Sequence, residues 1–258
     1  MIVLASFASV QPFNRLGQCA VFSSLHETSQ QSSQSEIERL TSQLKSSDEE
    51  ERRQATLMLA ALETPAAIPA LTSALNDTSE RVRAHAITGL ARLGDPSLVA
   101  VIAARLAQDK KPFVRKAAAY ALGKFGRAEG TAALVAALKD KDIEVRGAAS
   151  VALGEYRDAS AIAPLSIALA DKSDFVRAQS ARALGVNGRA AAQSVTLLIK
   201  LLTSDKDPYV KRHAATALGQ IGEHAALPAL ERAMRDHDPY LSQAASEAIK
   251  MITANNGV

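Results

Sequence analysis

Apolar residues recur along this chain at the spacing of one face of an α-helix. From residue 145 they follow at intervals of four, seven, eight and eleven residues, as Val145, Ala149, Ala152, Leu153 and Tyr156. A shorter apolar stretch with a similar spacing precedes them over residues 132–138. Because both stretches follow the 3.6-residue period of a helix, this segment is predicted to form a pair of amphipathic helices.

The same pattern returns along the chain and can be aligned on a valine followed by Arg or Lys. These anchor valines are Val82, Val114, Val145, Val176 and Val210, so the steps are 32, 31, 31 and 34 residues. Degenerate copies flank them at Glu51 and Leu241. A repeat of this length is typical of stacked units that bury their apolar faces against one another. The predicted fold is therefore all-α, an α-solenoid of about seven helical hairpins over residues 35–254.

Polar residues mark where the second helix of each pair begins, and glycines mark where it ends. Three residues before the anchors stand the predicted N-caps Asp48, Ser79, Asp142, Ser173, Asp207 and Asp238. Lys111 departs from this rule, but Pro112 after it suits the first turn of a helix. Glycines that would accept a left-handed C-cap are Gly94, Gly126, Gly188 and Gly222.

Further glycines lie inside the second helices, where each costs about 1 kcal/mol relative to alanine. They are Gly123, Gly154, Gly185 and Gly219. Close backbone packing between neighbouring pairs would compensate for this cost, and we expect it here.

Aspartates occupy one equivalent position in successive units and predict a structural row. They are Asp77, Asp109, Asp140, Asp171, Asp205 and Asp236. We expect this row to lie near the cations that follow the anchors, which are Arg83, Arg115, Arg146, Arg177 and Lys211. The partner of Asp140 would be Arg115 or Arg146. If exposed, each pair would contribute about 0–1 kcal/mol.

The chain resembles the short HEAT-like repeats of the phycobilisome-lyase type over roughly Glu36 to Thr253. The phrase that carries the resemblance is Asp-x-Asp-x-x-Val-Arg-x-x-Ala-x-x-Ala-Leu-Gly, nearly intact at Asp140 to Gly154 and, with Lys211 in place of Arg, at Asp205 to Gly219. The resemblance implies HEAT-like hairpins that hold a partner protein. Its alternative implication is a bilin lyase or detachment subunit, or a chaperone acting on phycobiliproteins, which would handle a bilin.

The segment before the repeats, residues 1–34, is predicted to be a disordered or weakly ordered tail. Its opening apolar stretch of about ten residues lacks a preceding Lys or Arg, so it does not fit a signal peptide. Leu16 to Cys19 faintly resembles a lipoprotein cleavage box, although Gln18 departs from that motif. We expect a cytoplasmic protein without a membrane span, and a lipoprotein or secreted form stays open as an alternative.

Composition and charge narrow the function classes. Thirty basic and 27 acidic residues give a net charge of +3, and no clustered basic run is present, so we do not expect a nucleic-acid partner. The single cysteine, Cys19, excludes an internal disulfide. Some repeat proteins of this kind, such as deoxyhypusine hydroxylase, hold iron through paired His-Glu motifs, whereas this chain has one, His26-Glu27.

The remaining histidines lie in different units without carboxylates at ligand spacing; they are His85, His213, His224 and His237. No catalytic residue, metal site or cofactor is therefore predicted.

Positions two and six residues beyond each anchor vary from unit to unit, which suggests a surface adapted to a partner. Second helices usually line the concave side of such a stack. The candidate partner-binding residues on that side are Arg92, Lys116, Tyr120, Lys124, Arg182 and Arg212. Cations around an aromatic ring could hold an acidic protein segment. The predicted function is a non-enzymatic scaffold that binds another protein along its concave face.

Overall fold

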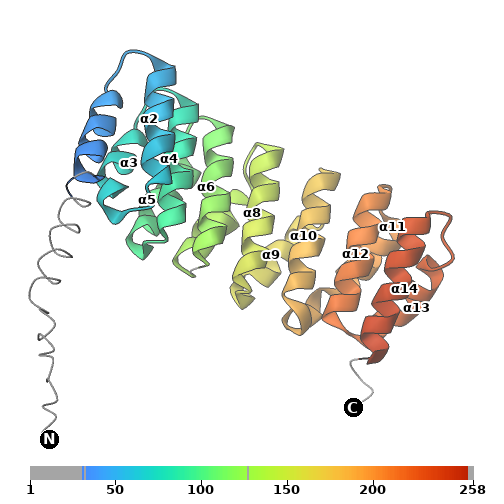
Figure 1. Ribbon diagram of the computed structural model, residues 1–258. Coiled ribbons are helices and arrows are strands. Elements are labelled where there is room, and N and C mark those ends of the chain that lie inside the picture. The colour runs from blue at the N-terminus through green and yellow to red at the C-terminus, as the bar shows by residue number, and fades with distance from the viewer. Residues whose placement is uncertain (1–30, 32, 127, 255–258) are drawn as a thin grey trace, which may run out of the picture.

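The computed structural model describes residues 31, 33–126 and 128–254, and within these residues it contains helices and turns but no strand. Helices succeed one another in pairs and stack side by side into one elongated array, whose described ends lie at opposite extremes (Figure 1). The predicted all-α solenoid is confirmed. Most of the predicted tail, residues 1–34, lies outside the described residues.

Seven helix pairs follow one another in the described residues, and the first begins with the helix of residues 33–43. The first helices of the later pairs, each preceded by a short 3-10 segment, are α3 (Ile68–Ala74), α5 (Val99–Gln108), α7 (Thr131–Ala137), α9 (Ile162–Ala168), α11 (Val195–Ser204) and α13 (Leu227–Ala233). The second helices are α2 (Glu49–Ala61), α4 (Glu80–Leu93), α6 (Pro112–Phe125), α8 (Ile143–Tyr156), α10 (Asp174–Val186), α12 (Pro208–Ile221) and α14 (Pro239–Ala254).

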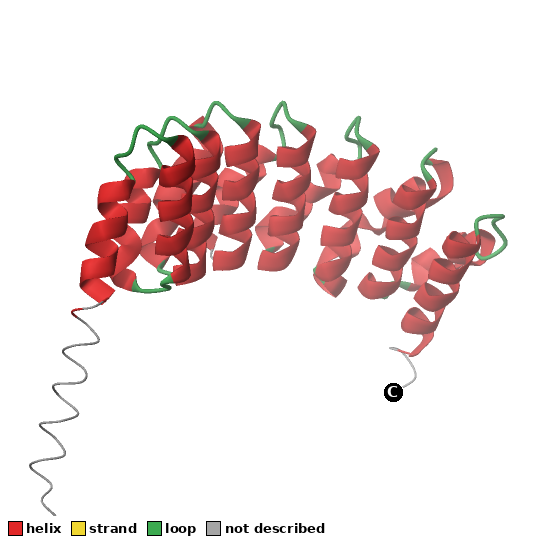
Figure 2. Cartoon of the chain, turned by 45° about the horizontal axis from the view of Figure 1, so that its top comes forward, coloured by secondary structure: helices red, strands yellow, loops and turns green. Residues whose placement is uncertain are grey.

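The core lies between the row of first helices and the row of second helices. All five anchor valines are fully buried, and so are the leucines eight residues after them, such as Leu153. Burying one such side chain contributes about 1.5–3 kcal/mol. Figure 2 shows the second helices as a continuous row of similar elements along the stack, joined to the first helices by short loops. The repeat thus places one face of every second helix in an equivalent position.

The predicted helix caps are confirmed in most units. Asp142 accepts hydrogen bonds from the backbone N–H groups of Glu144 and Val145, and Asp48, Ser79, Asp207 and Asp238 cap their helices in the same manner. The prediction for Ser173 was wrong in one respect. Ser173 holds the N-cap position, but its side chain accepts no hydrogen bond from the first turn of α10.

The glycines predicted to follow the second helices adopt the left-handed backbone conformation, as expected. Gly94, Gly126, Gly188 and Gly222 have φ between 56° and 82°. After α8, Arg157 takes this conformation with φ 49°. A non-glycine residue can therefore end a second helix where the sequence offers no glycine.

Glycines inside the second helices allow their backbones to approach closely, as predicted. A Cβ added to Gly154 would lie 2.8 Å from both Cα and Cβ of Ala183 on the next second helix. Gly123, Gly185 and Gly219 face an alanine of the next unit in the same way, and Gly89 faces Ala60 of the preceding unit. The row of second helices is therefore joined by glycine–alanine contacts.

Arginine–aspartate ion pairs join successive units. Arg115 donates to both carboxylate oxygens of Asp140, with Nε and Nη2 each 2.7 Å from an oxygen, and its Nη1 donates to the carbonyl oxygen of Asp109 at 3.0 Å. Each arginine therefore binds the loop of its own unit and the aspartate of the next. The ion-pair ladder consists of Arg52–Asp77, Arg83–Asp109, Arg115–Asp140, Arg146–Asp171 and Arg177–Asp205.

The ladder differs from the prediction at its last rung and in its burial. Arg212 pairs with Asp238 at 2.8 Å, and no ion pair joins the described residues Lys211 and Asp236. The side chains of Arg115 and Asp140 are only 5% and 13% exposed, so the surface value of 0–1 kcal/mol does not apply.

Burial and hydrogen bonding act against each other on the ladder carboxylates. Burial by itself raises the pKa of Asp140, but the Arg115 guanidinium and the backbone N–H of Asp142 outweigh it and hold this pKa below its ordinary value. The pKa values of Asp77, Asp109, Asp171 and Asp205 are lowered by the same balance. These aspartates are therefore ionised at neutral pH.

Candidate functional site

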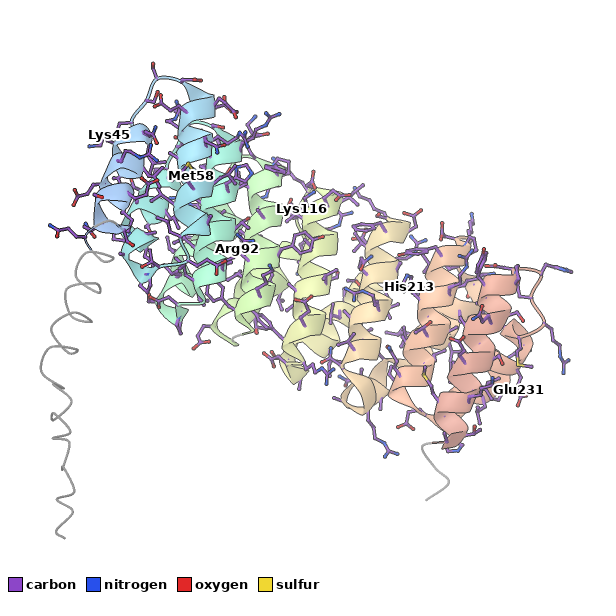
Figure 3. All side chains as sticks on the ribbon, in the orientation of Figure 1. Lys45, Met58, Arg92, Lys116, His213 and Glu231 are labelled. Carbon is purple, nitrogen blue, oxygen red and sulfur yellow. The ribbon has the colours of Figure 1, made fainter. Side chains whose placement is uncertain are left out.

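The exposed side chains of the second helices, from α2 to α14, form a surface that we call the second-helix face. Figure 3 shows Arg92, Lys116 and His213 along this row. The varied positions two residues beyond the anchors do not all belong to this surface. Ala84, Gly147 and Ala178 are buried there, and the ring of Phe175 covers Gly147.

Lys116, Tyr120 and Lys124 lie together at one groove between α4 and α6. We call it the α4–α6 groove; its volume is about 240 Å³, and its lining is Thr88, Ala91, Phe113, Lys116, Ala117, Tyr120, Ala121 and Lys124. Tyr120 is 43% exposed and Phe113 is 44% exposed. The groove therefore combines two aromatic rings, two ammonium groups and the hydroxyl groups of Thr88 and Tyr120 around an alanine surface.

A difference in the repeat coincides with this groove. The other junctions between neighbouring second helices place a glycine against an alanine, as Gly154 faces Ala183. At the equivalent positions of the α4–α6 junction both residues are alanines, Ala91 and Ala121, and both line the groove. Two Cβ atoms need more space than one, so an alanine pair holds two helices further apart than a glycine–alanine pair does.

The cations of the groove have few protein partners. Lys116 Nζ lies 3.5 Å from Glu144 Oε2 on α8, and this pair is exposed, at 31% and 60% of the two side chains. Arg92, next in sequence to Ala91, is exposed on α4. An exposed pair of this kind adds little stability, so Lys116 is available to another carboxylate.

The other two candidates, Arg182 and Arg212, lie away from the α4–α6 groove, on α10 and α12. Arg212 is engaged within the protein, since it pairs with Asp238 and its guanidinium lies 4.9 Å from the ring centroid of Tyr240. Arg182 donates to Gln179 Oε1 at 3.2 Å. The candidate residues therefore divide between the α4–α6 groove and a second cluster near the C-terminal end.

Two histidines on the second-helix face are held neutral at pH 7. Burial lowers the pKa of His213, and the positive charges of Arg182 and Arg212 lower it further. Burial likewise lowers the pKa of His85, together with Arg53 and Arg81. His213 also contacts Tyr209 edge-on, with ring centroids 4.3 Å apart. His213 therefore packs against an aromatic ring beside two arginines.

Among the described residues, no group of three or more His, Cys, Asp or Glu side chains is arranged to hold a metal ion. Cys19 and the His26-Glu27 pair lie outside that part of the chain. The described helices include none long and apolar enough to cross a membrane.

Sequence reasoning missed Phe113 and Thr88 as parts of the groove. Phe113 precedes its anchor valine by one residue. Three other units also have an aromatic residue at this position, namely Phe175, Tyr209 and Tyr240. This recurrence was a readable signal. Thr88 had no comparable signal beyond its place in the varied positions.

The repeat pattern matches a known family along nearly all of its length. The family model for HEAT repeats matches residues 37–123, 99–185 and 166–250. The chain belongs to the HEAT-repeat family. This match confirms the resemblance that rests on the two well-preserved phrases. A comparison with curated proteins found no match.

Solved structures with a similar fold come from several sources. The complex of CpcE and CpcF of phycocyanin lyase from Nostoc sp. PCC7120 is 24% identical, with 84% of this chain and 94% of that chain covered and a TM-score of 0.53. The Escherichia coli protein YibA is 23% identical, with 85% and 82% covered and a TM-score of 0.64. An engineered protein is 24% identical, with 84% and 68% covered and a TM-score of 0.53. At these identities the likeness concerns the fold.

Proposed function

We propose that this HEAT-repeat chain is a non-enzymatic scaffold that binds another protein along its second-helix face. The observation that carries the proposal is the placement of aromatic side chains. All four exposed aromatic residues of the described chain, Phe113, Tyr120, Tyr209 and Tyr240, lie on second helices, with 43–65% of each exposed. Aromatic residues are enriched in the surfaces that proteins use to bind one another.

The glycine–alanine junctions support a concave shape for this face. They draw the second helices close together at successive units, and in a curved stack the more closely spaced row lies on the inner side. A concave face surrounds a partner with side chains from several units. The proposed compartment is the cytoplasm, where a chain with one cysteine needs no disulfide.

Site-specific photo-crosslinking tests the proposal. A photoreactive phenylalanine analogue replaces Tyr120, Tyr209 or Tyr240 in turn, and Ile167 on α9, which is 74% exposed, serves as the matched control among the first helices. The expected result is one protein product crosslinked from the tyrosine positions and not from Ile167, with binding reproduced by the purified partner. Crosslinks from Ile167 alone, or from none of the four positions, would overturn the proposal.

The same protein is then mixed with phycocyanobilin to examine the alternative implied by the family resemblance. Under the scaffold proposal the visible absorbance of the pigment does not change. A shifted band that is lost on mutation of the second-helix face would favour bilin handling instead. The α4–α6 groove, at about 240 Å³, is smaller than the roughly 300–1,000 Å³ typical of small-molecule sites, which favours a protein side chain as its occupant.

A further inference from the structure

We infer that the α4–α6 groove binds an extended acidic segment of a partner, in which two carboxylates flank an aromatic or branched aliphatic side chain. This inference rests on the proposed function, since it names the chemistry of the partner at one place on the second-helix face. The groove supplies complementary groups for both parts of such a segment, two lysines eight residues apart on α6 and an apolar seat of alanines and aromatic rings.

The spacing of the cations sets the spacing of the carboxylates. Lys116 and Lys124 lie eight residues apart on α6, which corresponds to about 12 Å along the helix axis, and Tyr120 lies midway between them. An extended chain advances about 3.3 Å per residue, so residues four apart are separated by about 13 Å. Alternate residues of an extended chain share one side. The matching segment is therefore acidic at its first and fifth positions and apolar at its third.

The apolar seat is made of small and aromatic side chains. Its walls are Ala91, Ala117 and Ala121, and the rings of Phe113 and Tyr120 lie beside them. Aromatic rings favour edge-to-face and offset contacts with another ring, so phenylalanine is the preferred residue at the third position. At this junction Ala91 and Ala121 take the place of the glycine–alanine contact that brings the other second helices close together.

The charges around the groove favour binding of an acidic segment once Lys116 exchanges its present partner, Glu144, for a carboxylate of that segment. Lys116 leaves the exposed contact with Glu144 and takes the incoming carboxylate. On α8, the carboxylate of Glu155 lies near Gly123 of α6. Lys116 and Lys124 line the groove, and Arg92 is exposed next to Ala91 on α4, so these positive charges attract an acidic chain.

Fluorescence anisotropy with a labelled synthetic nonapeptide tests this inference. The peptide carries glutamate at positions three and seven, phenylalanine at position five, and glycine or serine elsewhere. We expect saturable binding, at least tenfold weaker binding to the Lys116→Glu/Lys124→Glu variant, and a change of less than twofold with Lys250→Glu on α14. A peptide of the same composition with adjacent glutamates should bind at least fivefold more weakly. Far-UV circular dichroism and thermal melting confirm that each variant is folded.

A charge exchange separates recognition from general damage to the protein. A peptide with lysine in place of both glutamates should bind the Lys116→Glu/Lys124→Glu variant better than it binds the wild-type chain. Equal affinity of wild type and double variant for the glutamate peptide, or equal affinity for the two glutamate arrangements, would overturn the inference. Tighter binding of a single-stranded oligonucleotide at Lys116 and Lys124 would also overturn it. If crosslinking from Tyr209 and Tyr240 persists in these cases, the scaffold proposal stands while this inference fails.

Discussion

Breaking one buried rung of the ion-pair ladder should lower the free energy of unfolding far more than breaking an exposed ion pair between the same two units. Arg115 and Asp140 form two hydrogen bonds of 2.7 Å with little exposure. Changing Asp140→Asn removes the carboxylate charge and leaves the guanidinium buried, which should cost about 3–5 kcal/mol of the free energy of unfolding. Arg115→Met should cost at least as much, because the carbonyl oxygen of Asp109 also loses its donor, Nη1 of Arg115.

The energy of the pair itself comes from a double-mutant cycle. Two charge-assisted hydrogen bonds at this burial should give a coupling energy of roughly 2 kcal/mol between Arg115 and Asp140. The matched control is Lys116 and Glu144, which join the same two units at 3.5 Å in a more exposed setting. Their coupling energy should stay below about 0.5 kcal/mol.

The assay is urea denaturation followed by far-UV circular dichroism at neutral pH. Equal denaturant slopes across the variants show that the same cooperative unit unfolds, which a repeat array does not guarantee. A coupling energy for Arg115–Asp140 no larger than that for Lys116–Glu144 would refute the reasoning that burial makes the ladder a main joint between units.

Four further predictions follow from the packing and charges. Leu153→Ala should lower the free energy of unfolding by about 2–5 kcal/mol in the same denaturation assay, because it leaves a cavity in the core; a loss below about 1 kcal/mol would contradict the burial. Gly154→Ala should cost roughly 1–3 kcal/mol despite the better helix propensity of alanine, since its Cβ would lie 2.8 Å from Ala183; an unchanged urea midpoint would argue against the close approach. The five ladder aspartates have lowered pKa values in the folded protein, so their contribution to the free energy of unfolding is complete above the ordinary pKa of 3.8 and is lost as the pH falls through the lower folded values. The urea midpoint should therefore decrease as the pH is lowered from about 5 to about 3. A midpoint that does not change over this range would be inconsistent with lowered pKa values. Ala91→Gly should let α4 and α6 approach and weaken binding of the acidic nonapeptide severalfold in fluorescence anisotropy with every charge in place, whereas unchanged affinity would show that the alanine pair does not hold the groove open.

The helical repeat and its boundaries could be predicted because both depend on residues close together in sequence. The valine and leucine positions define one helix face through a 3.6-residue period, and a cap such as Asp142 binds N–H groups only two and three residues away. Ser173 shows the limit of this reasoning, because a suitable cap residue can leave its bond unmade when Asp174 beside it binds the N–H of Phe175 instead.

The candidate site was predicted in part. Lys116, Tyr120 and Lys124 could be placed on one side of a helix from their spacing, and the structure puts them at one groove. Phe113 and the buried state of Gly147 could not be assigned in this way, because each depends on which neighbouring helix lies against it. Arg212 had appeared equivalent to the other cations, yet it is engaged by Asp238 and Tyr240 of the next unit.

Local sequence was enough to determine helix pairs, their number, their caps and the equivalence of one row of aspartates, since these features follow from backbone geometry within a single unit. Contacts between units decided which arginine reaches which aspartate, how deeply each pair is buried, and where two second helices stand apart. A one-dimensional repeat places residues in equivalent positions, but the fit of each surface against the next depends on the particular side chains that meet there. One example is Ala91, which stands where most units have a glycine. It lines the α4–α6 groove together with the predicted residues Lys116, Tyr120 and Lys124.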